Sequence, residues 1–243
     1  MIERFVPAAS SYASHVDGLF TLIFVLVGFW LLLSEAVFFW LIFRFRNKGV
    51  GVGEGEGGRK AEYITGEQKS HKRWISIPHA LVLVCDIFII VGAVRVWYEV
   101  KQDLPPAQQT VRVMGQQWAW SFVHPGPDGE LDTSDDIATV DELHLQVDTV
   151  YHYKLEARDV LHGFSIPAFR LKQDAVPGRV ITGWFEPIQT GSFDIQCAEI
   201  CGIGHGLMVA RLVVESPAQH AAWMAEHSPV ALVAAADPLP PGE

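Results

Sequence analysis

Residues 197–208 read CAEICGIGHGLM, and four side chains with metal-binding atoms stand close together in this run. They are the thiols of Cys197 and Cys201, the imidazole of His205 and the thioether of Met208. Thiolate, imidazole and thioether are soft or borderline donors that suit copper or zinc far better than calcium or magnesium, and the thioether favours copper. Glycines let the backbone wrap closely around a small ion, and here they occupy positions 202, 204 and 206. The run therefore predicts a soft metal site in a loop between two strands.

A disulfide between Cys197 and Cys201 is the alternative to a metal site, but it leaves His205 and Met208 unexplained. A further ligand has to come from elsewhere in the chain. His162 is the best candidate, because it follows a predicted strand in a turn that apolar residues flank. Taken singly, His162 is an ordinary loop histidine and Met208 an ordinary core residue. The conjunction of donors is what favours a metal.

The sequence around this loop has a β texture. Short branched or aromatic runs alternate with turn residues such as the PGPDG of 125–129, which predicts a sandwich or barrel. The prolines at 105 and 106 end the preceding segment, so we expect this domain to cover residues 104–215. Beyond it we expect a short helix over 217–227 and a Pro/Ala-rich, disordered end, together 216–243. The predicted strands lie at 110–114, 118–123, 142–147, 150–157, 178–185, 191–196 and 207–214.

Two long apolar segments precede the β-rich region, at 19–43 and 74–97. Each exceeds the roughly 20 residues that span a bilayer as a helix, so residues 1–103 predict a transmembrane hairpin. A cleaved signal peptide is the alternative for the first segment, but its apolar run is too long and two arginines follow it. The connecting loop, 44–73, is rich in glycine and charge.

Basic residues give the orientation of this hairpin. The first eighteen residues hold only Arg4, whereas the loop holds eight lysines and arginines. Basic loops stay in the cytoplasm, so both termini and the β-rich domain are expected on the outer side. We expect a multi-pass protein of a bacterial plasma membrane with a periplasmic domain, although a mitochondrial inner membrane has the same topology. The eight residues are Arg44, Arg46, Lys48, Arg59, Lys60, Lys69, Lys72 and Arg73.

The loop at 197–208 resembles the copper loop of subunit II of cytochrome c oxidase. The resemblance extends to DVLH at 159–162, LKQDAVPGR at 171–179 and GQQWAWS at 115–121. With the two-span hairpin it covers nearly the whole chain. It implies a cupredoxin-like Greek-key β-barrel, behind the hairpin, that carries the binuclear copper centre called CuA.

The resemblance also implies the ligands of that centre. Two thiolates bridge two copper ions, each imidazole binds one ion, the thioether is a weak ligand, and one backbone carbonyl completes the set. Bridging thiolates spread the odd electron over both metals, so little geometry changes on reduction. The residue that supplies the carbonyl, Glu199, also has a side-chain carboxylate. This carboxylate is expected to reach a magnesium or manganese ion shared with subunit I; the alternative is a solvated acid. The implied residues are Cys197, Cys201, His162, His205, Met208 and Glu199.

Trp118 matches the tryptophan through which the family accepts electrons from cytochrome c. The alternative is a structural aromatic that alternates with Trp120 on one strand. Ala119 stands where the family usually has an aromatic residue, which makes this surface less conventional. The chain has a net charge of −10, and a group of acidic residues in the β-rich domain could steer a basic cytochrome by long-range attraction. The alternative is a solvated loop that keeps the protein soluble. A calcium-binding loop at 128–136 is a weaker alternative. These acids are Asp128, Glu130, Asp132, Asp135, Asp136, Asp141, Glu142 and Asp148, while Arg158 replaces a common family acid.

Ionisable residues inside the predicted spans also suggest function. Glu35 lies in the first span, and His79 and Asp86 share one face of the second, so we expect all three to face subunit I. His71 stands where many family members have a glutamate at the mouth of a proton path, so proton uptake is expected to differ. The alternative is a histidine at headgroup level.

These observations predict subunit II of a respiratory cytochrome c oxidase. It would accept electrons from a c-type cytochrome and pass them to haem in subunit I, where oxygen is reduced to water and protons are pumped. The chain has no CxxCH haem-attachment motif and too few spans to catalyse this alone. The alternatives are a subunit of a copper-containing nitric oxide reductase and a membrane-anchored copper carrier; a quinol oxidase subunit lacks these ligands. The expected partners are subunit I, other oxidase subunits, the cytochrome and the membrane, with no nucleic acid.

Overall fold

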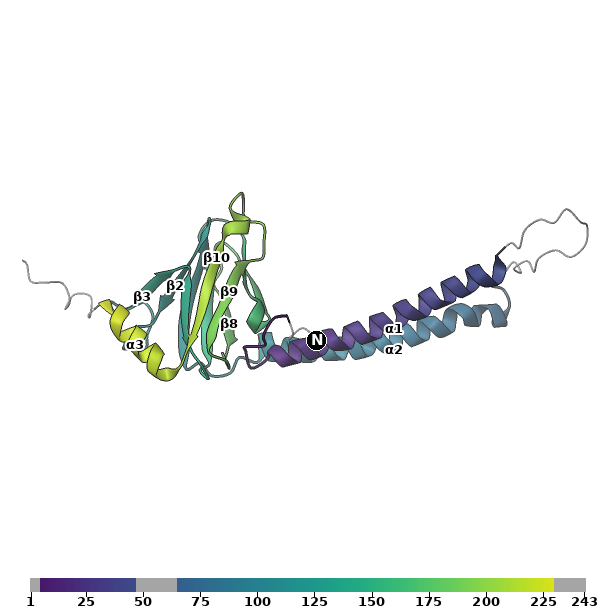
Figure 1. Cartoon of the computed structure of the whole chain (residues 1–243), viewed down its shortest axis with the longest axis horizontal. Coiled ribbons are helices and arrows are strands. Elements are labelled where there is room, and N and C mark those ends of the chain that lie inside the picture. Colours follow the sequence, from purple (N-terminus) through teal and green to yellow (C-terminus); the bar gives the residue numbers. More distant parts are fainter. Residues whose placement is uncertain (1–4, 47–64, 230–243) are drawn as a thin grey trace, which may run out of the picture. The chain divides into compact units, whose positions relative to one another are not determined.

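The computed structural model describes residues 5–46 and 65–229 of the 243-residue chain. The described residues form two compact units (Figure 1): one runs from Gly18 to Arg95, and the other joins the segment before it to everything from Val96 onward. Most of the expected glycine-rich loop, and the expected disordered end at 230–243, lie outside the described residues.

The first unit consists of the long helices α1 (Ala13–Phe45) and α2 (Lys69–Trp97), apart from the ends of each that belong to the second unit. Both helices are long and apolar enough to cross a membrane, and the most apolar stretch of each has no buried residue in the chain by itself. One contact between them joins Trp30 Nε1 to Cys85 Sγ at 3.4 Å. The apolar surfaces need lipid or partner helices to cover them. The helices contain the predicted spans 19–43 and 74–97.

The second unit is built from two five-stranded sheets in the described residues, ordered β3-β2-β1-β5-β8 and β4-β10-β9-β6-β7. Neighbouring strands run antiparallel except for β1 with β5 and β10 with β4. Together with the hairpin, the sheets confirm the predicted fold class, a two-helix hairpin followed by an all-β, cupredoxin-like domain. The strands are β1 (Gln109–Gln116), β2 (Ala119–His124), β3 (Ile137–Val140), β4 (Glu142–Gln146), β5 (Tyr151–Ala157), β6 (His162–Ile166), β7 (Leu171–Ala175), β8 (Ile181–Phe185), β9 (Gly191–Cys197) and β10 (Val209–Glu215).

Side chains of alternating burial form the core. Along β1, β2 and β5 every second residue is buried, as expected for strands with one face on the core. Aromatic rings fill the interior in edge-to-face and stacked pairs, among them Trp120 with Phe164 at 5.3 Å and Tyr153 with Phe185 at 5.6 Å between centroids. The core therefore fixes the positions of the strand ends that carry the functional residues.

Short helical elements complete this unit. A π-helical turn (Tyr98–Gln102) follows α2, and two 3-10 turns lie at Pro167–Phe169 and His205–Leu207. The predicted C-terminal helix is present as α3 (Pro217–His227). It begins with a proline in its first turn, and the Gln219 side chain accepts a hydrogen bond of 3.0 Å from the Ser216 backbone N–H.

The N-terminal segment packs on the β-domain, although the sequence places the domain boundary at residues 103 and 104. Ala9 N–H donates to the Ala168 carbonyl at 2.8 Å, and Ser11 N–H donates to the Glu186 carbonyl at 3.0 Å. Because these backbone partners lie more than 150 residues away, local sequence patterns carry no sign of them. The β-domain of the structure therefore includes the first turn of α1.

Arg170 holds this segment in place. Its guanidinium donates to both carboxylate oxygens of Asp17, at 2.7 and 2.8 Å, and to the carbonyls of Val6 and Pro7 at 3.0 and 3.1 Å. The Arg170 and Asp17 side chains are each only 8% exposed. Bidentate pairing of this kind combines charge with fixed geometry.

We expect Arg170→Leu to destabilise the domain by about 3–5 kcal/mol, the usual cost of breaking a buried ion pair by removing one partner. The change leaves a buried carboxylate and two carbonyls without the guanidinium. Thermal unfolding of the full chain in detergent should show a melting temperature lower by roughly 10 °C. Arg179→Leu, at an exposed arginine, is the matched control. Equal melting temperatures for the two variants would contradict this role of Arg170.

Candidate metal centre

The predicted metal loop connects two neighbouring strands. β9 ends at Cys197 and β10 begins at Val209, and the backbone N–H of Cys197 donates to the Met208 carbonyl at 3.1 Å, which closes the loop at its base. On its other edge β9 pairs with β6, with Phe164 opposite Cys197. Since β6 begins at His162, this pairing brings the distant histidine to the cysteines.

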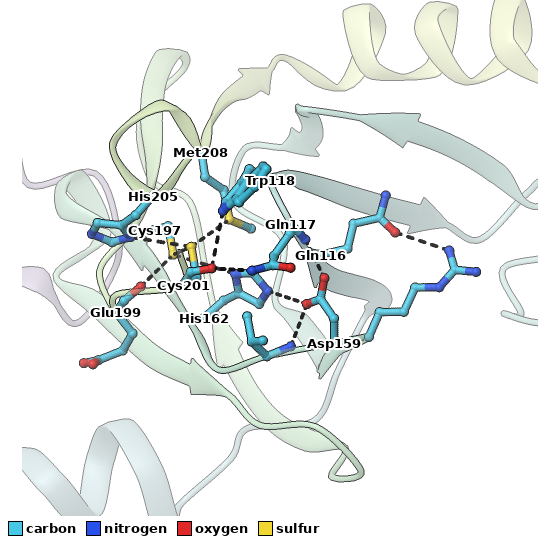
Figure 2. A network of polar contacts seen from close by, with 12 residues as sticks. Gln116, Gln117, Trp118, Asp159, His162, Cys197, Glu199, Cys201, His205 and Met208 are labelled. Carbon is cyan, nitrogen blue, oxygen red and sulfur yellow. Dashed lines mark hydrogen bonds and ion pairs between the residues drawn. The ribbon is translucent and has the colours of Figure 1, made fainter. Parts of the chain in front are cut away.

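The predicted donor atoms lie together (Figure 2). The two cysteine Sγ atoms are 3.7 Å apart. Cys197 Sγ lies 3.9 Å from His162 Nδ1, and Cys201 Sγ lies 3.6 Å from His205 Nδ1. The Met208 thioether is 3.8 Å from Cys201 Sγ, and the Glu199 carbonyl is 3.3 Å from Cys197 Sγ.

These separations fit a shared metal site. Ligand atoms about 2.0–2.3 Å from one ion in tetrahedral arrangement are about 3.3–3.8 Å apart. A disulfide needs about 2.05 Å between sulfurs, so both cysteines are free thiols here, and the alternative of a disulfide is not realised. One donor atom from each of His162, Cys197 and Cys201 lies within 4.8 Å of the others. The donors present therefore fit a soft metal such as copper.

The site is largely shielded from water. His162 is fully buried, Met208 is 1% exposed and Cys201 is 3% exposed. Burial, with a smaller effect of the neighbouring Cys197 thiol, raises the pKa of the Cys201 thiol to about 11. A bound cation would reverse this preference, because its charge stabilises thiolates. Metal binding here should therefore release protons.

Asp159 determines which nitrogen of His162 faces the thiols. Its carboxylate oxygen Oδ1 lies 2.9 Å from His162 Nε2. An ionised carboxylate only accepts hydrogen bonds, so Nε2 carries the proton and Nδ1 presents its lone pair to the site. Burial opposes ionisation of Asp159, yet hydrogen bonds from His162 and from the Gln117 and Val160 backbones hold the pKa of this carboxyl below its usual range.

Gln117 joins this support to the loop. Its backbone N–H donates to Asp159 Oδ2 at 2.8 Å, and its side-chain amide donates to the Cys201 carbonyl at 2.7 Å. Figure 2 shows the resulting chain of contacts from His162 through Asp159 and Gln117 to Cys201. Sequence reasoning assigned no role to Asp159 or Gln117. The position of Asp159, three residues before a candidate histidine, was the one available signal.

Trp118 covers the same loop from outside. Its indole N–H donates to the Cys201 carbonyl at 3.3 Å, and the side chain is 39% exposed. A Cβ at Gly204 would lie 2.4 Å from the indole, so only glycine permits this contact. Trp120, by contrast, is fully buried in the core. The two tryptophans therefore differ in role, and the exposed one touches the loop.

The backbone and the side chain of Glu199 make different contacts. Its carbonyl lies near the thiols, whereas its carboxylate accepts from Lys172 Nζ at 2.6 Å. Around it the loop exposes large apolar side chains, with Ile200 82% and Ile203 95% exposed. Such a surface is typical of a face that a partner covers.

Asp132 and Arg158, among the remaining predicted residues, have partners other than these donor atoms. Asp132 pairs with Arg112 at 2.7 Å, and Arg158 donates to Gln116 at 3.2 Å. Glu35 on α1 and His79 and Asp86 on α2 have exposed side chains in the chain by itself, whereas His71, in the first turn of α2, is partly buried. They are therefore accessible to a neighbouring subunit.

Comparisons with known proteins point in one direction. Residues 109–216 match the family model described as cytochrome c oxidase subunit II, periplasmic domain. The chain is 32% identical to the alternative cytochrome c oxidase subunit 2 of Bradyrhizobium diazoefficiens, over 90% of this chain and 82% of that protein. It is 26% identical to cytochrome c oxidase subunit 2 of Cereibacter sphaeroides, over 90% of this chain and 78% of that protein. Among solved structures, the periplasmic domain of subunit II of Bradyrhizobium japonicum cytochrome oxidase is 31% identical, with a TM-score of 0.46 over 51% of this chain and 96% of that one.

The support given by Asp159 leads to a prediction. Asp159→Asn removes the negative charge that fixes the His162 tautomer, so copper affinity should fall by about 10- to 100-fold, as for other residues that orient metal ligands. Competition with a copper chelator measures this affinity. Asp194→Asn, an exposed carboxylate on β9, is the matched control. An unchanged affinity in the Asp159 variant would show that the carboxylate does not orient the ligand.

Proposed function

The chain belongs to the cytochrome c oxidase subunit II family, the electron-accepting subunit of an oxidoreductase, and on this premise we propose that it accepts electrons at a binuclear copper centre of the CuA type. The observation that carries the proposal is the pairing of donors. Each of the two adjacent thiols has its own imidazole, His162 for Cys197 and His205 for Cys201. This arrangement suits two ions with shared thiolates.

The surrounding residues would hold such a centre rigidly. Cys197 and Cys201 would bridge the ions, while Met208 and the Glu199 carbonyl lie next to opposite sulfurs and would complete the two coordination shells. Two copper ions, when bound, supply a one-electron couple shared across the thiolates. The buried loop and the Asp159 contact keep ligand movement small, which favours fast electron transfer.

The Glu199 carboxylate offers a link to subunit I. We propose that it binds a magnesium or manganese ion at that interface, since hard ions prefer carboxylate oxygens. In the chain by itself Lys172 already neutralises this carboxylate. Binding of a divalent ion would therefore require Lys172 to move aside.

Electrons would arrive from a c-type cytochrome and leave to haem in subunit I. Trp118 is the proposed point of arrival, because it is partly exposed and directly contacts the carbonyl of a bridging cysteine. The acidic residues between Asp128 and Asp148 would attract a basic cytochrome over long range. The helices α1 and α2 would anchor the chain in the membrane, and the basic residues of the connecting loop support an orientation with the β-domain on the outer, periplasmic side.

The burial of the site argues against a copper carrier. A carrier that delivers metal needs exposed, exchangeable ligands, whereas Cys201, Met208 and His162 are almost inaccessible to water. In addition, a proposed ligand is held in its orientation by a neighbouring side chain: Asp159 orients His162. These features favour a resident centre.

Electron paramagnetic resonance of the copper-loaded full chain tests the proposal. We expect one unpaired electron shared equally by two coppers, and we expect Cys201→Ser to abolish both this signal and the purple colour while the fold is retained. Cys85→Ser, in α2, is the matched control and should change neither. A spectrum of isolated single coppers in the unmodified chain would overturn the proposal.

Trp118→Phe tests whether electrons from the cytochrome enter at Trp118. The substitution removes the indole N–H that reaches the Cys201 carbonyl, so oxidation of cytochrome c by the assembled oxidase should slow, while copper content stays the same. Trp97→Phe, at the end of α2, controls for loss of a tryptophan elsewhere. Unchanged kinetics would reject Trp118 as the point of arrival.

A further inference from the structure

A second group of metal-binding side chains lies at the other end of the β-domain. α3 follows the end of β10 that is distant from the copper loop (Figure 1), and the seven residues of β10 span about 20 Å of extended chain. Trp223 of α3 is buried there among histidines. In the part of the chain that the structure describes, four histidine rings have centroids 4.2 to 5.8 Å from the indole, those of His124, His144, His220 and His227.

Glu215 holds two of these rings by hydrogen bonds. Its carboxylate oxygens lie 3.0 Å from His144 Nδ1 and 2.9 Å from His220 Nδ1. Because an ionised carboxylate only accepts hydrogen bonds, Nδ1 is the donor atom of each ring, and in the neutral form of His220 the lone pair lies on Nε2. A carboxylate behind a histidine in this way is the usual support of a metal-binding imidazole.

His220 lines a cavity of about 220 Å³ between α3 and the strands. His124, at the end of β2, and Met224, one helical turn after His220, line the same cavity. Residues four apart share a face of a helix, so His220 and Met224 present their side chains to one side of α3. Two imidazole side chains and a thioether side chain therefore line one pocket that is partly open to solvent. The other lining residues include Gln109, Val111 and Tyr151.

His124 is the independent sign of a ligand. It is 2% exposed, and its Nε2 is buried without a hydrogen-bond partner among the described residues. Buried polar atoms are nearly always paired, so an unpaired one calls for a specific reason. Burial, with smaller contributions from His144 and His220, lowers the pKa of His124 to about 3. The ring is therefore neutral at physiological pH, the form in which imidazole binds metals.

We propose that His124, His220 and Met224 form a second metal site that binds Cu(I), separate from the copper loop. The donor set selects the metal, since a thioether with two imidazoles is soft and suits monovalent copper, whereas magnesium and calcium require oxygen ligands. Glu215 orients His220 from behind. The site does not depend on the proposed CuA centre, because none of its residues belongs to the loop at 197–208.

Titration of the full chain with Cu(I) tests this site. The copper loop is first filled in detergent solution, and Cu(I) is then added without oxygen in competition with the chromophoric chelator bicinchoninate. The unmodified chain should take up one further equivalent. Met224→Leu, which keeps the volume but removes the sulfur, and His220→Asn should each lower its affinity by about tenfold or more, the scale on which ligand environment alters metal binding. The signal of the copper loop should stay unchanged, which separates failure of this proposal from failure of the function proposed above.

Two matched substitutions serve as controls. Met114→Leu removes a thioether from β1, and His227→Asn removes a histidine from α3 that contacts Trp223 without lining the cavity. Neither should affect the further equivalent. The proposal is overturned if no further equivalent binds, if the controls weaken binding as much as the test variants, or if Met224→Leu leaves the Cu(I) affinity unchanged.

Discussion

The pairing of β6 with β9 is the contact on which the candidate metal centre depends. It sets Phe164 opposite Cys197, and the Ala198 N–H donates to the Gly163 carbonyl at 2.8 Å, so His162 is held beside the thiols. Gly163 makes this approach possible, because a Cβ there would lie 2.8 Å from the Glu199 backbone nitrogen. A shift of the register by one residue would turn His162 to the other face of its sheet and separate it from the cysteines. The loop itself contains one imidazole, His205, beside Cys201. The fold adds the other, His162, beside Cys197.

A single chain of hydrogen bonds then ties the ligands to the surface. It runs from His162 to Asp159, from Asp159 to the Gln117 backbone, and from the Gln117 side chain to Cys201. Trp118 joins it at the same carbonyl of Cys201. A charge-assisted contact at one end and a buried ligand at the other leave these groups little freedom to move. The proposed point of electron arrival and the proposed acceptor are thus parts of one rigid surface.

The two ends of the β-domain make different use of histidine. At the copper loop, Asp159 turns one imidazole toward two thiols. At α3, Glu215 orients two imidazoles in a region without thiols, and His124 stays buried and neutral nearby. Similar carboxylate support therefore accompanies different donor sets. Bridging thiolates suit the proposed one-electron centre at the loop, whereas imidazoles with a thioether suit the proposed Cu(I) site at α3.

Local patterns were enough to predict the two apolar helices, the β-domain, the helix α3 and five candidate donor residues, because hydropathy, strand alternation and the grouping of soft donors are all short-range features. The resemblance to subunit II added the backbone carbonyl of Glu199 and the expectation of two copper ions. Only the tertiary structure decided which residues support these donors and where the domain begins. Asp159 and Gln117 are 42 residues apart, and Asp17 and Arg170 are 153 apart. Such contacts arise from strand pairing and packing across the whole chain, and no periodicity in the sequence encodes them.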